Sequence, residues 1–240
     1  ISVEPDRIEA ELAGLWRKAA ERARSEGSRF SVTRACLWNL IVHPRTLAAV
    51  EQVMGEGFAF HHLHASVQQA GTRGVHWHQD YEQVPQTNRS HVMVHVFYYF
   101  NGLNGEVGDL VFLPRSQNAV VGNDGLRILG EHSLPGEVVV DDLPPGSAVM
   151  VHSALWHARR ARPGGQDRPR YFADASYCQA GVRWPSYHNA AWRDMLAIAR
   201  TNLGDADPRL HLFREEHFFD AREAHAALRQ VQGSLIEGTR

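Results

Sequence analysis

The stretch from residue 58 to residue 178 consists of short apolar or β-branched runs separated by turn residues, with almost no helical periodicity. Short strands at this spacing, with Gly- and Pro-containing turns between them, are typical of a sandwich or a double-stranded β-helix. We therefore expect a mainly β protein with flanking helices and a jelly-roll, cupin-like core. The runs that we read as its strands are 58–68, 91–100, 109–114, 138–140, 147–151 and 170–177.

Helical patterns precede and follow this β-rich stretch. Apolar or alanine-rich faces recur at helical spacing in four segments, 5–25, 44–54, 190–203 and 221–236. No internal repeat, low-complexity tract or linker divides the sequence. We expect a single domain over 1–240, made of a helical N-terminal flank (1–57), the jelly-roll core (58–178) and a helical C-terminal flank (179–240).

The composition argues against several classes of protein. With 240 residues, 43% of them hydrophobic, the chain is long enough to bury one sizeable core. The formal net charge of −2 argues against nucleic-acid binding, which needs a basic surface. No apolar run has the length of a membrane span, and we find no secretory leader. Cys36 and Cys178 lack metal-binding spacing, so we expect reduced thiols in a cytoplasmic protein without membrane partners.

Two short motifs indicate a metal site. In a strand, residues i and i+2 point to the same side, so His78 and Asp80 can both project from one face. A histidine from a later strand would complete a 2-His-1-carboxylate triad, which leaves half of the coordination sphere of Fe(II) open. The candidates are His132, His152 and His157. His157 is favoured because it closes an apolar strand, where a ligand would lie at the mouth of the barrel.

An arginine follows the favoured histidine at a useful distance. Arg168 lies eleven positions after His157. The planar guanidinium group binds a carboxylate through two parallel hydrogen bonds, as would suit the far carboxylate of 2-oxoglutarate. The other arginines of this segment are expected mainly on a solvated loop face.

Other readings of the same residues remain open. His76 and His78 could hold zinc with Asp80 as the third ligand. Alternatively, His76, His78 and His157 could hold zinc, and Asp80 would then act as the base of a hydrolase or isomerase on a cupin-like barrel. A third reading is a non-catalytic barrel that binds a ligand. The histidines at 61, 62 and 64 are expected mostly in the core or behind the ligands.

The motifs resemble, in order, those of the phytanoyl-CoA dioxygenase family. They are Trp77-His78-Gln79-Asp80, the strand at 92–97, the segment 108–117 and the ending from Pro145-Gly146-Ser147 to His157-x10-Arg168. The resemblance spans about 58–178 and implies a double-stranded β-helix that uses Fe(II), 2-oxoglutarate and O2. It implies His78, Asp80 and His157 as iron ligands and Arg168 as the 2-oxoglutarate anchor. It also implies that Asp80 distinguishes this chain from halogenating relatives, which carry a small residue there.

The sequence departs from the family pattern near the 2-oxoglutarate site. Arg159 stands where the family often has a small or hydroxyl residue, so Arg159 or Arg170 could share the carboxylate with Arg168. The family's upstream strand supplies a polar contact to the co-substrate, for which Gln68 is our choice and Ser66 and His64 are alternatives. The expected function is an oxygenase that hydroxylates or otherwise oxidises a small metabolite or biosynthetic intermediate, with release of succinate and CO2.

Overall fold

The computed structural model describes residues 38–162, 164, 169–187, 192–220 and 224. The expected helix at 5–25, nearly all of the one at 221–236, and the side chains of Cys36 and Arg168 lie outside the described residues. Within them, no helix is both long and apolar enough to cross a membrane. The thiol of Cys178 is free and buried.

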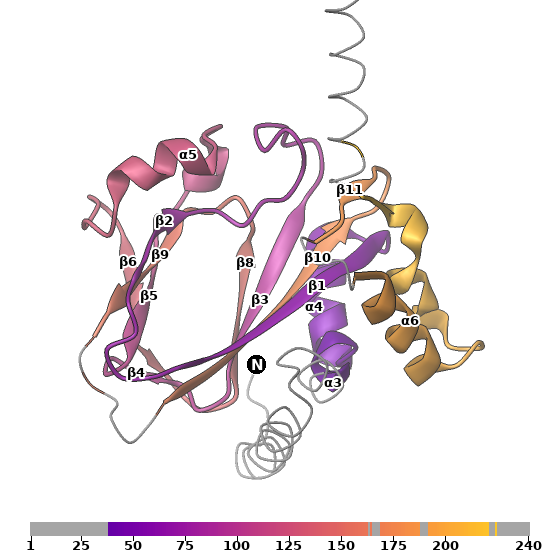
Figure 1. Cartoon of the computed structure of the whole chain (residues 1–240), viewed down its shortest axis with the longest axis horizontal. Coiled ribbons are helices and arrows are strands. Elements are labelled where there is room, and N and C mark those ends of the chain that lie inside the picture. The colour runs from indigo at the N-terminus through magenta and orange to yellow at the C-terminus, as the bar shows by residue number, and fades with distance from the viewer. Residues whose placement is uncertain (1–37, 163, 165–168, 188–191, 221–223, 225–240) are drawn as a thin grey trace, which may run out of the picture.

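Two four-stranded antiparallel sheets face each other and form the jelly roll (Figure 1). We call them sheet I and sheet II. In both, strands from distant parts of the sequence are neighbours, which confirms the expected mainly β, double-stranded β-helix core. Sheet I has the order β1 (Phe58–Gln68), β10 (Arg170–Gln179), β3 (Met93–Tyr99), β8 (Ser147–His152). Sheet II has the order β2 (Val75–His78), β9 (His157–Ala161), β5 (Gly108–Phe112), β6 (Val138–Val140).

Helices cover the outer face of sheet I (Figure 1). Phe60 of β1 packs edge-on against Tyr177 of β10 at 5.9 Å between ring centroids, and its other neighbour is Phe213 at 5.6 Å. All three rings are fully buried, so this layer is the main apolar core. The covering elements are α3 (Trp38–Ile41), α4 (Pro44–Met54), α6 (Trp192–Leu203) and the 3-10 helix η3 (Pro208–Phe213).

Short elements complete the fold. In the described part of the C-terminal flank, α6 lies where a helix was expected, and β11 and β12 add a short parallel strand pair. The two-residue strands of the fold are β4 (Leu103–Asn104), β7 (Asp142–Leu143), β11 (Trp184–Pro185) and β12 (Phe218–Phe219). The remaining helical turns are α5 (Asn123–Leu126), η1 (Ser116–Asn118), η2 (Arg127–Leu129) and η4 (Glu215–His217).

A β-bulge in β1 decides which side chains face the space between the sheets. Phe60 pairs with Tyr177, but the next pair is His62 with Ser176, so His61 is an extra residue on this strand. The extra residue inverts the alternation of the side chains. Phe60 therefore points to the helix-covered core, whereas His62 and the residues at two-residue steps after it point between the sheets.

Candidate metal centre and its cavity

Two of the three expected ligands are direct neighbours across sheet II. His78 ends β2, His157 begins β9, and the two residues pair in register with their rings 4.1 Å apart. The sequence reasoning assumed that Asp80 lies on the strand. In the structure, Asp80 lies two residues beyond the end of β2. Its backbone N–H donates to the Ser153 carbonyl at 2.8 Å, which fixes the chain where the carboxylate turns toward the imidazoles.

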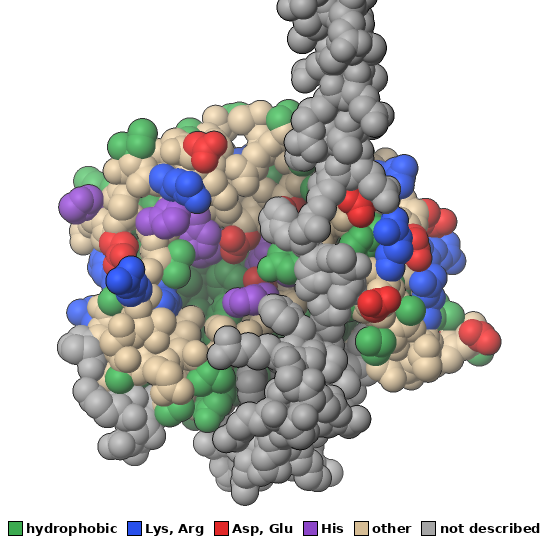
Figure 2. All heavy atoms as spheres, viewed as in Figure 1, with side chains coloured by type: hydrophobic (Ala, Val, Ile, Leu, Met, Phe, Trp, Pro, Cys, Tyr) green, Lys and Arg blue, Asp and Glu red, His purple; other side chains and the backbone are tan. Residues whose placement is uncertain are grey.

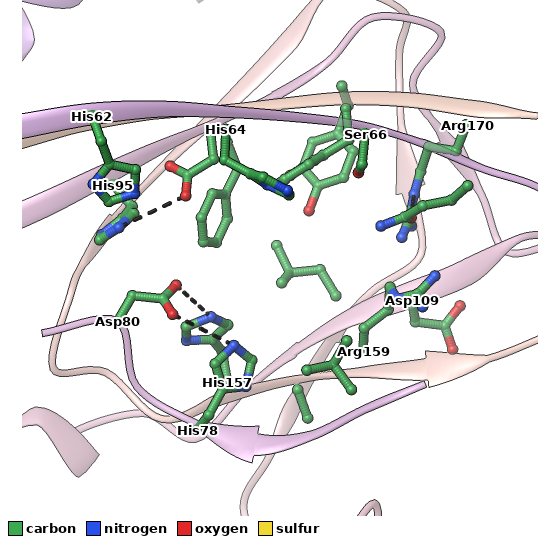
Figure 3. Close-up of a pocket in the computed structure, with 18 of the residues that line it drawn as sticks. His62, His64, Ser66, His78, Asp80, His95, Asp109, His157, Arg159 and Arg170 are labelled. Atoms are coloured by element: carbon green, nitrogen blue, oxygen red, sulfur yellow. Dashed lines mark hydrogen bonds and ion pairs between the residues drawn. The ribbon is translucent and has the colours of Figure 1, made fainter. Parts of the chain in front are cut away.

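The three side chains converge on one point (Figure 3). Asp80 Oδ2 lies 3.0 Å from His157 Nε2, and Asp80 Oδ1 lies 3.6 Å from His78 Nε2. One ligand atom from each residue lies within 4.8 Å of the other two. The Nδ1 atoms of both histidines face backbone carbonyls, of His76 at 2.8 Å and of Leu155 at 3.0 Å. Such contacts place the proton on Nδ1 and leave the Nε2 lone pair for a metal.

The electrostatics of the three residues suit a cation. Burial alone would raise the pKa of Asp80, but His157, His95 and His78 together hold it well below its usual range. Burial, and after it the neighbouring His157, lower the pKa of His78 to about 4. For His157, burial is outweighed by the charge and hydrogen bond of Asp80, so its pKa is raised. Without a metal, the Asp80 carboxylate is therefore ionised and favours the protonated form of His157.

The other candidate ligands do not join this group. Among the described residues, the group that converges at this centre consists of His78, Asp80 and His157 alone. His152 stacks on Tyr81 with ring centroids 6.5 Å apart, and its Nδ1 accepts from a backbone N–H at 3.1 Å. The ring of His76 lies 6.0 Å from that of His78. His157 is therefore the third residue that the fold brings to the His-x-Asp segment.

The three residues open into a cavity of about 360 Å³ between the two sheets. Figure 2 shows the hollow, with histidine and acidic side chains gathered around it. Its apolar walls include Phe97, Leu110 and Phe172. At one end lies the metal centre, and at the other end lie two arginines, Arg159 and Arg170 (Figure 3). A molecule in the cavity can therefore contact a metal and a guanidinium group together.

Arg170 is held rigidly at the far end of the cavity. Its Nε donates to Gln68 Oε1 at 2.6 Å, its Nη1 donates to the Gly108 carbonyl at 2.7 Å, and its guanidinium group lies over the Tyr99 ring at 5.6 Å. The residue is only 4% exposed. Burial lowers its pKa to about 10, which still leaves it charged at neutral pH. Gln68 thus lines the cavity and orients Arg170.

Arg159 adds a second positive charge beside Arg170. Two of its nitrogens, Nε and Nη1, are buried without a hydrogen-bond partner. Asp109, which also lines the cavity, is paired with Arg162 at 2.5 Å. Within the part of the chain that the structure describes, neither Arg159 nor Arg170 has a carboxylate within ion-pair distance. This end of the cavity is therefore suited to a small anion.

Sequence reasoning missed one wall of the cavity. His62 and His64 were expected mainly in the core, but both line the cavity, together with His95 and Asp174 from neighbouring strands of sheet I. The signal was present in β1, where polar residues recur at every second position from His62 to Gln68. That alternation is typical of a strand with one polar face.

Comparisons with known proteins agree with this architecture. The family model of phytanoyl-CoA dioxygenase (PhyH) matches residues 7–169. A search of the curated proteins finds no match. Among solved structures, the non-heme alpha ketoglutarate dependent epimerase SnoN from nogalamycin biosynthesis is 18% identical, with a TM-score of 0.53 over 71% of this chain and 74% of its own.

Two further solved structures have the same fold. HygX from Streptomyces hygroscopicus, solved with iron bound, is 16% identical, with a TM-score of 0.54 over 72% of this chain and 79% of its own. HygX has also been solved with nickel and 2-oxoglutarate, and with hygromycin B in addition. The non-heme monooxygenase ThoJ, solved as a nickel complex, is 17% identical, with a TM-score of 0.53 over 73% of this chain and 74% of its own.

The solved structures show the fold alone, whereas the family model shows the family. It spans more than half of the chain and includes His78, Asp80 and His157, the three residues that the fold brings together. The chain therefore belongs to the phytanoyl-CoA dioxygenase (PhyH) family.

Proposed function

We propose that this protein is an Fe(II)- and 2-oxoglutarate-dependent oxygenase that oxidises a small organic molecule, with release of succinate and CO2. The observation that carries the proposal is the convergence of His78, Asp80 and His157 at one end of a cavity. The other end carries Arg159 and Arg170, which have no carboxylate partner among the described residues. Two imidazoles and one carboxylate, with the remaining positions open, are the ligand set of non-haem Fe(II) oxygenases.

The chain's own residues would hold and orient the reactants. His78 Nε2, Asp80 and His157 Nε2 would hold Fe(II), and the carbonyls behind the two imidazoles would keep their rings in place. Bound Fe(II) with 2-oxoglutarate supplies the oxidation of an unactivated C–H bond by O2. The rings of Phe97 and Phe172 would keep bulk water from the reacting atoms.

We place the far carboxylate of 2-oxoglutarate at the arginine end of the cavity. Arg170 is buried, preorganised by Gln68, and free of a carboxylate partner among the described residues. Arg159 would add its charge to the same anion. Arg168 lies outside the described residues, so its role as the anchor stays a prediction from the family resemblance. The three arginines can be separated by experiment.

The cavity and the relatives support a proposal for the substrate class. A cavity of about 360 Å³ also has to accommodate 2-oxoglutarate, which leaves room for part of a substrate molecule. HygX has been solved with hygromycin B, and SnoN belongs to nogalamycin biosynthesis. By analogy, we propose a small biosynthetic intermediate as the substrate. Hydroxylation, epimerisation and ring formation differ only in the fate of the substrate after the first C–H bond is broken.

Co-substrate binding can be tested before the substrate is known. Metal-free protein is mixed anaerobically with Fe(II) and 2-oxoglutarate, and the visible absorption band of a keto acid bound to Fe(II) is recorded. We expect the band in the parent protein and its loss in Asp80→Asn. Succinate release in air, screened against candidate metabolites, then tests turnover. Tight zinc binding without the band or succinate would instead support the zinc hydrolase alternative.

Substitution of single arginines identifies the carboxylate anchor. A buried hydrogen bond to a charged group is worth roughly 1.5–3 kcal/mol, so Arg170→Gln should raise the dissociation constant of 2-oxoglutarate by about 10- to 100-fold. Arg168→Gln and Arg159→Gln are measured beside it. Arg160→Gln is the matched control, because Arg160 follows Arg159 on β9 but pairs with Glu137. A larger effect at position 168 than at position 170 would return the anchor to Arg168.

A further inference from the structure

A second group of two histidines and one carboxylate lies on the sheet I wall of the same cavity. Among the described residues, His62, His95 and Asp174 also bring one ligand atom each within 4.8 Å of the others, as the first centre does. They come from β1, β3 and β10, the three adjacent strands of sheet I. Figure 3 shows His62 and His95 across the cavity from Asp80. Neither the family motifs nor the proposed reaction uses it.

The two imidazoles are oriented as metal ligands usually are. His62 Nδ1 lies 2.7 Å from the Ser176 hydroxyl, and His95 Nδ1 lies 2.7 Å from the Ser153 hydroxyl. A hydrogen bond at one ring nitrogen fixes the ring and leaves the other nitrogen for a ligand. The ring of His62 is also stacked on Tyr187, with centroids 3.9 Å apart and an interplanar angle of 11°. Both histidines are therefore held in one orientation.

The carboxylate of Asp174 lacks a partner that matches its burial. Asp174 is 7% exposed, and its Oδ1 is buried with no hydrogen-bond partner in the described part of the chain. Its Oδ2 lies 3.7 Å from His95 Nε2, which is too long for a hydrogen bond. Two ligands of a tetrahedral zinc ion with bonds of about 2.0–2.2 Å are separated by roughly 3.4 Å, which is close to this distance. An ion between the two atoms would satisfy both.

A divalent ion would compete with a proton at this group. Burial raises the pKa of Asp174 well above its usual range, and the charge of Asp80 raises it further, so the metal-free group favours the protonated acid. Burial lowers the pKa of His95 to about 4 and that of His62 as well, so both imidazoles are neutral at neutral pH. An ion that displaces the proton of Asp174 would meet two neutral imidazoles and one carboxylate, which are a donor set for a divalent ion.

We propose that His62, His95 and Asp174 form a second divalent-metal site, with zinc as the ion that fits this donor set. All three residues line the cavity, so an ion can reach them from it. Three protein ligands leave a fourth position of a tetrahedral zinc ion open. That position would take an oxygen-bearing group of a molecule bound in the cavity. The inference does not depend on the proposed oxygenase activity.

Metal stoichiometry of the full chain tests the proposal. Metal-free protein is titrated anaerobically with Co(II) and separately with Zn(II), and bound metal is measured after desalting. We expect two equivalents in the parent protein and one in Asp174→Asn, in His95→Gln and in Asp80→Asn. Changes around the ligands alone weaken metal binding by roughly 10- to 100-fold, so loss of a ligand should weaken the second equivalent by more than about 100-fold.

A matched control separates this site from a general loss of cavity histidines. His64→Gln removes a histidine that faces the same cavity from β1 but belongs to neither group, so it should keep two equivalents. The remaining equivalent in Asp174→Asn shows that the variant is folded. A single equivalent in the parent protein, or a second equivalent that survives both Asp174→Asn and His95→Gln, would overturn the proposal. Two equivalents without 2-oxoglutarate binding would contradict the oxygenase and leave this site intact.

Discussion

At the scale of single residues, the metal centre is an acid between two bases. The carboxylate oxygens of Asp80 lie near the Nε2 atoms of both His78 and His157, and the shorter distance, 3.0 Å, is to His157. In the metal-free protein this pair resembles an ion pair, because the charge of Asp80 favours a proton on His157. A metal ion has to displace that proton before it can bind. Proton and metal therefore compete for the same nitrogen.

We expect this competition to make metal affinity depend on pH. Burial is outweighed by Asp80, so the pKa of His157 is above its usual value of about 6.5. As the pH falls below that raised pKa, His157 gains a proton and the apparent affinity for Co(II) should fall by about tenfold per pH unit. Above the pKa, the dependence on His157 should level off. Isothermal titration between pH 6 and pH 9 measures the effect.

The origin of the raised pKa can be checked by NMR on the metal-free protein. In Asp80→Asn, the charge and the ionic hydrogen bond are lost while burial remains, so the pKa of His157 should fall below that of the parent protein. An unchanged His157 titration in this variant would show that Asp80 does not control the proton.

The sequence allowed the metal ligands to be predicted, but not all of their geometry. The His-x-Asp spacing and the late histidine identified His78, Asp80 and His157, and the fold brings these three together. The strand argument for Asp80 was incomplete, because β2 ends at His78 and the Ser153 carbonyl positions the next turn. That contact joins residues far apart in the sequence, so local periodicity could not reveal it.

At the scale of elements, α4 is attached to sheet I through a buried hydroxyl pair. Thr46 Oγ1 of α4 lies 2.8 Å from the hydroxyl of Tyr98 on β3, and Tyr98 also donates to the Leu40 carbonyl at 3.2 Å. Burial raises the pKa of Tyr98 to about 12, although the Thr46 contact opposes the shift. The covering helix thus depends on a tyrosine that stays protonated.

We expect the ionisation of Tyr98 to lower the stability of the fold at alkaline pH. The unfolded chain ionises Tyr98 near pH 10, whereas the folded chain keeps the proton until about pH 12. Stability should therefore be unaffected by Tyr98 below pH 10 and fall between pH 10 and pH 12, by up to about 3 kcal/mol from this group. Urea unfolding at pH 8 and pH 11 measures the free-energy difference.

Two variants isolate the Tyr98 contribution from that of other buried tyrosines. Tyr98→Phe should lose about 1–2 kcal/mol at pH 8, because its hydrogen bonds are gone, and should then lose less than the parent protein on going to pH 11. Thr46→Val removes a hydrogen bond but keeps the ionisable group, so its alkaline loss should persist. Equal alkaline losses in Tyr98→Phe and the parent protein would assign the effect to other groups.

The ends of most core strands were predicted to within two residues. The direction in which their side chains point, toward the space between the sheets or away from it, was not predicted. Alternation of apolar and polar residues marks a strand and its polar face. In β1 the bulge at His61 inverts the alternation between Phe60 and His62. A bulge depends on pairing with β10, more than a hundred residues later. The second histidine group was missed for that reason.

At the scale of the whole molecule, the cavity relies on both sheets at once. Sheet II contributes His78 and His157, and sheet I contributes Arg170 and the wall around Asp174. The outer face of sheet I is buried under helices, whereas its inner face carries Asp174, whose Oδ1 has no hydrogen-bond partner among the described residues. Ligands that fill the cavity would therefore bind the folded state alone and stabilise it.

We expect metal and co-substrate to raise the melting temperature. A ligand at 100 times its dissociation constant adds about 2.7 kcal/mol to the stability of the folded state. For a chain of this size, each kcal/mol shifts the melting temperature by roughly 2–4 °C, so Co(II) at the first centre should add about 5–11 °C. 2-Oxoglutarate should add a further increment only when Co(II) is present, and calorimetry of metal-free and loaded protein measures both.

The variants make this shift diagnostic of the two sites. Asp80→Asn should lose the 2-oxoglutarate increment and the share of the Co(II) shift that belongs to the first centre. Asp174→Asn should keep the 2-oxoglutarate increment and lose only the share of the second site, because Asp174 belongs to the second group, whose His62 and His95 lie across the cavity from Asp80 (Figure 3). Identical Co(II) shifts in the parent protein and in both variants would mean that the metal stabilises the fold from somewhere else. In that case neither ligand group would be a metal site.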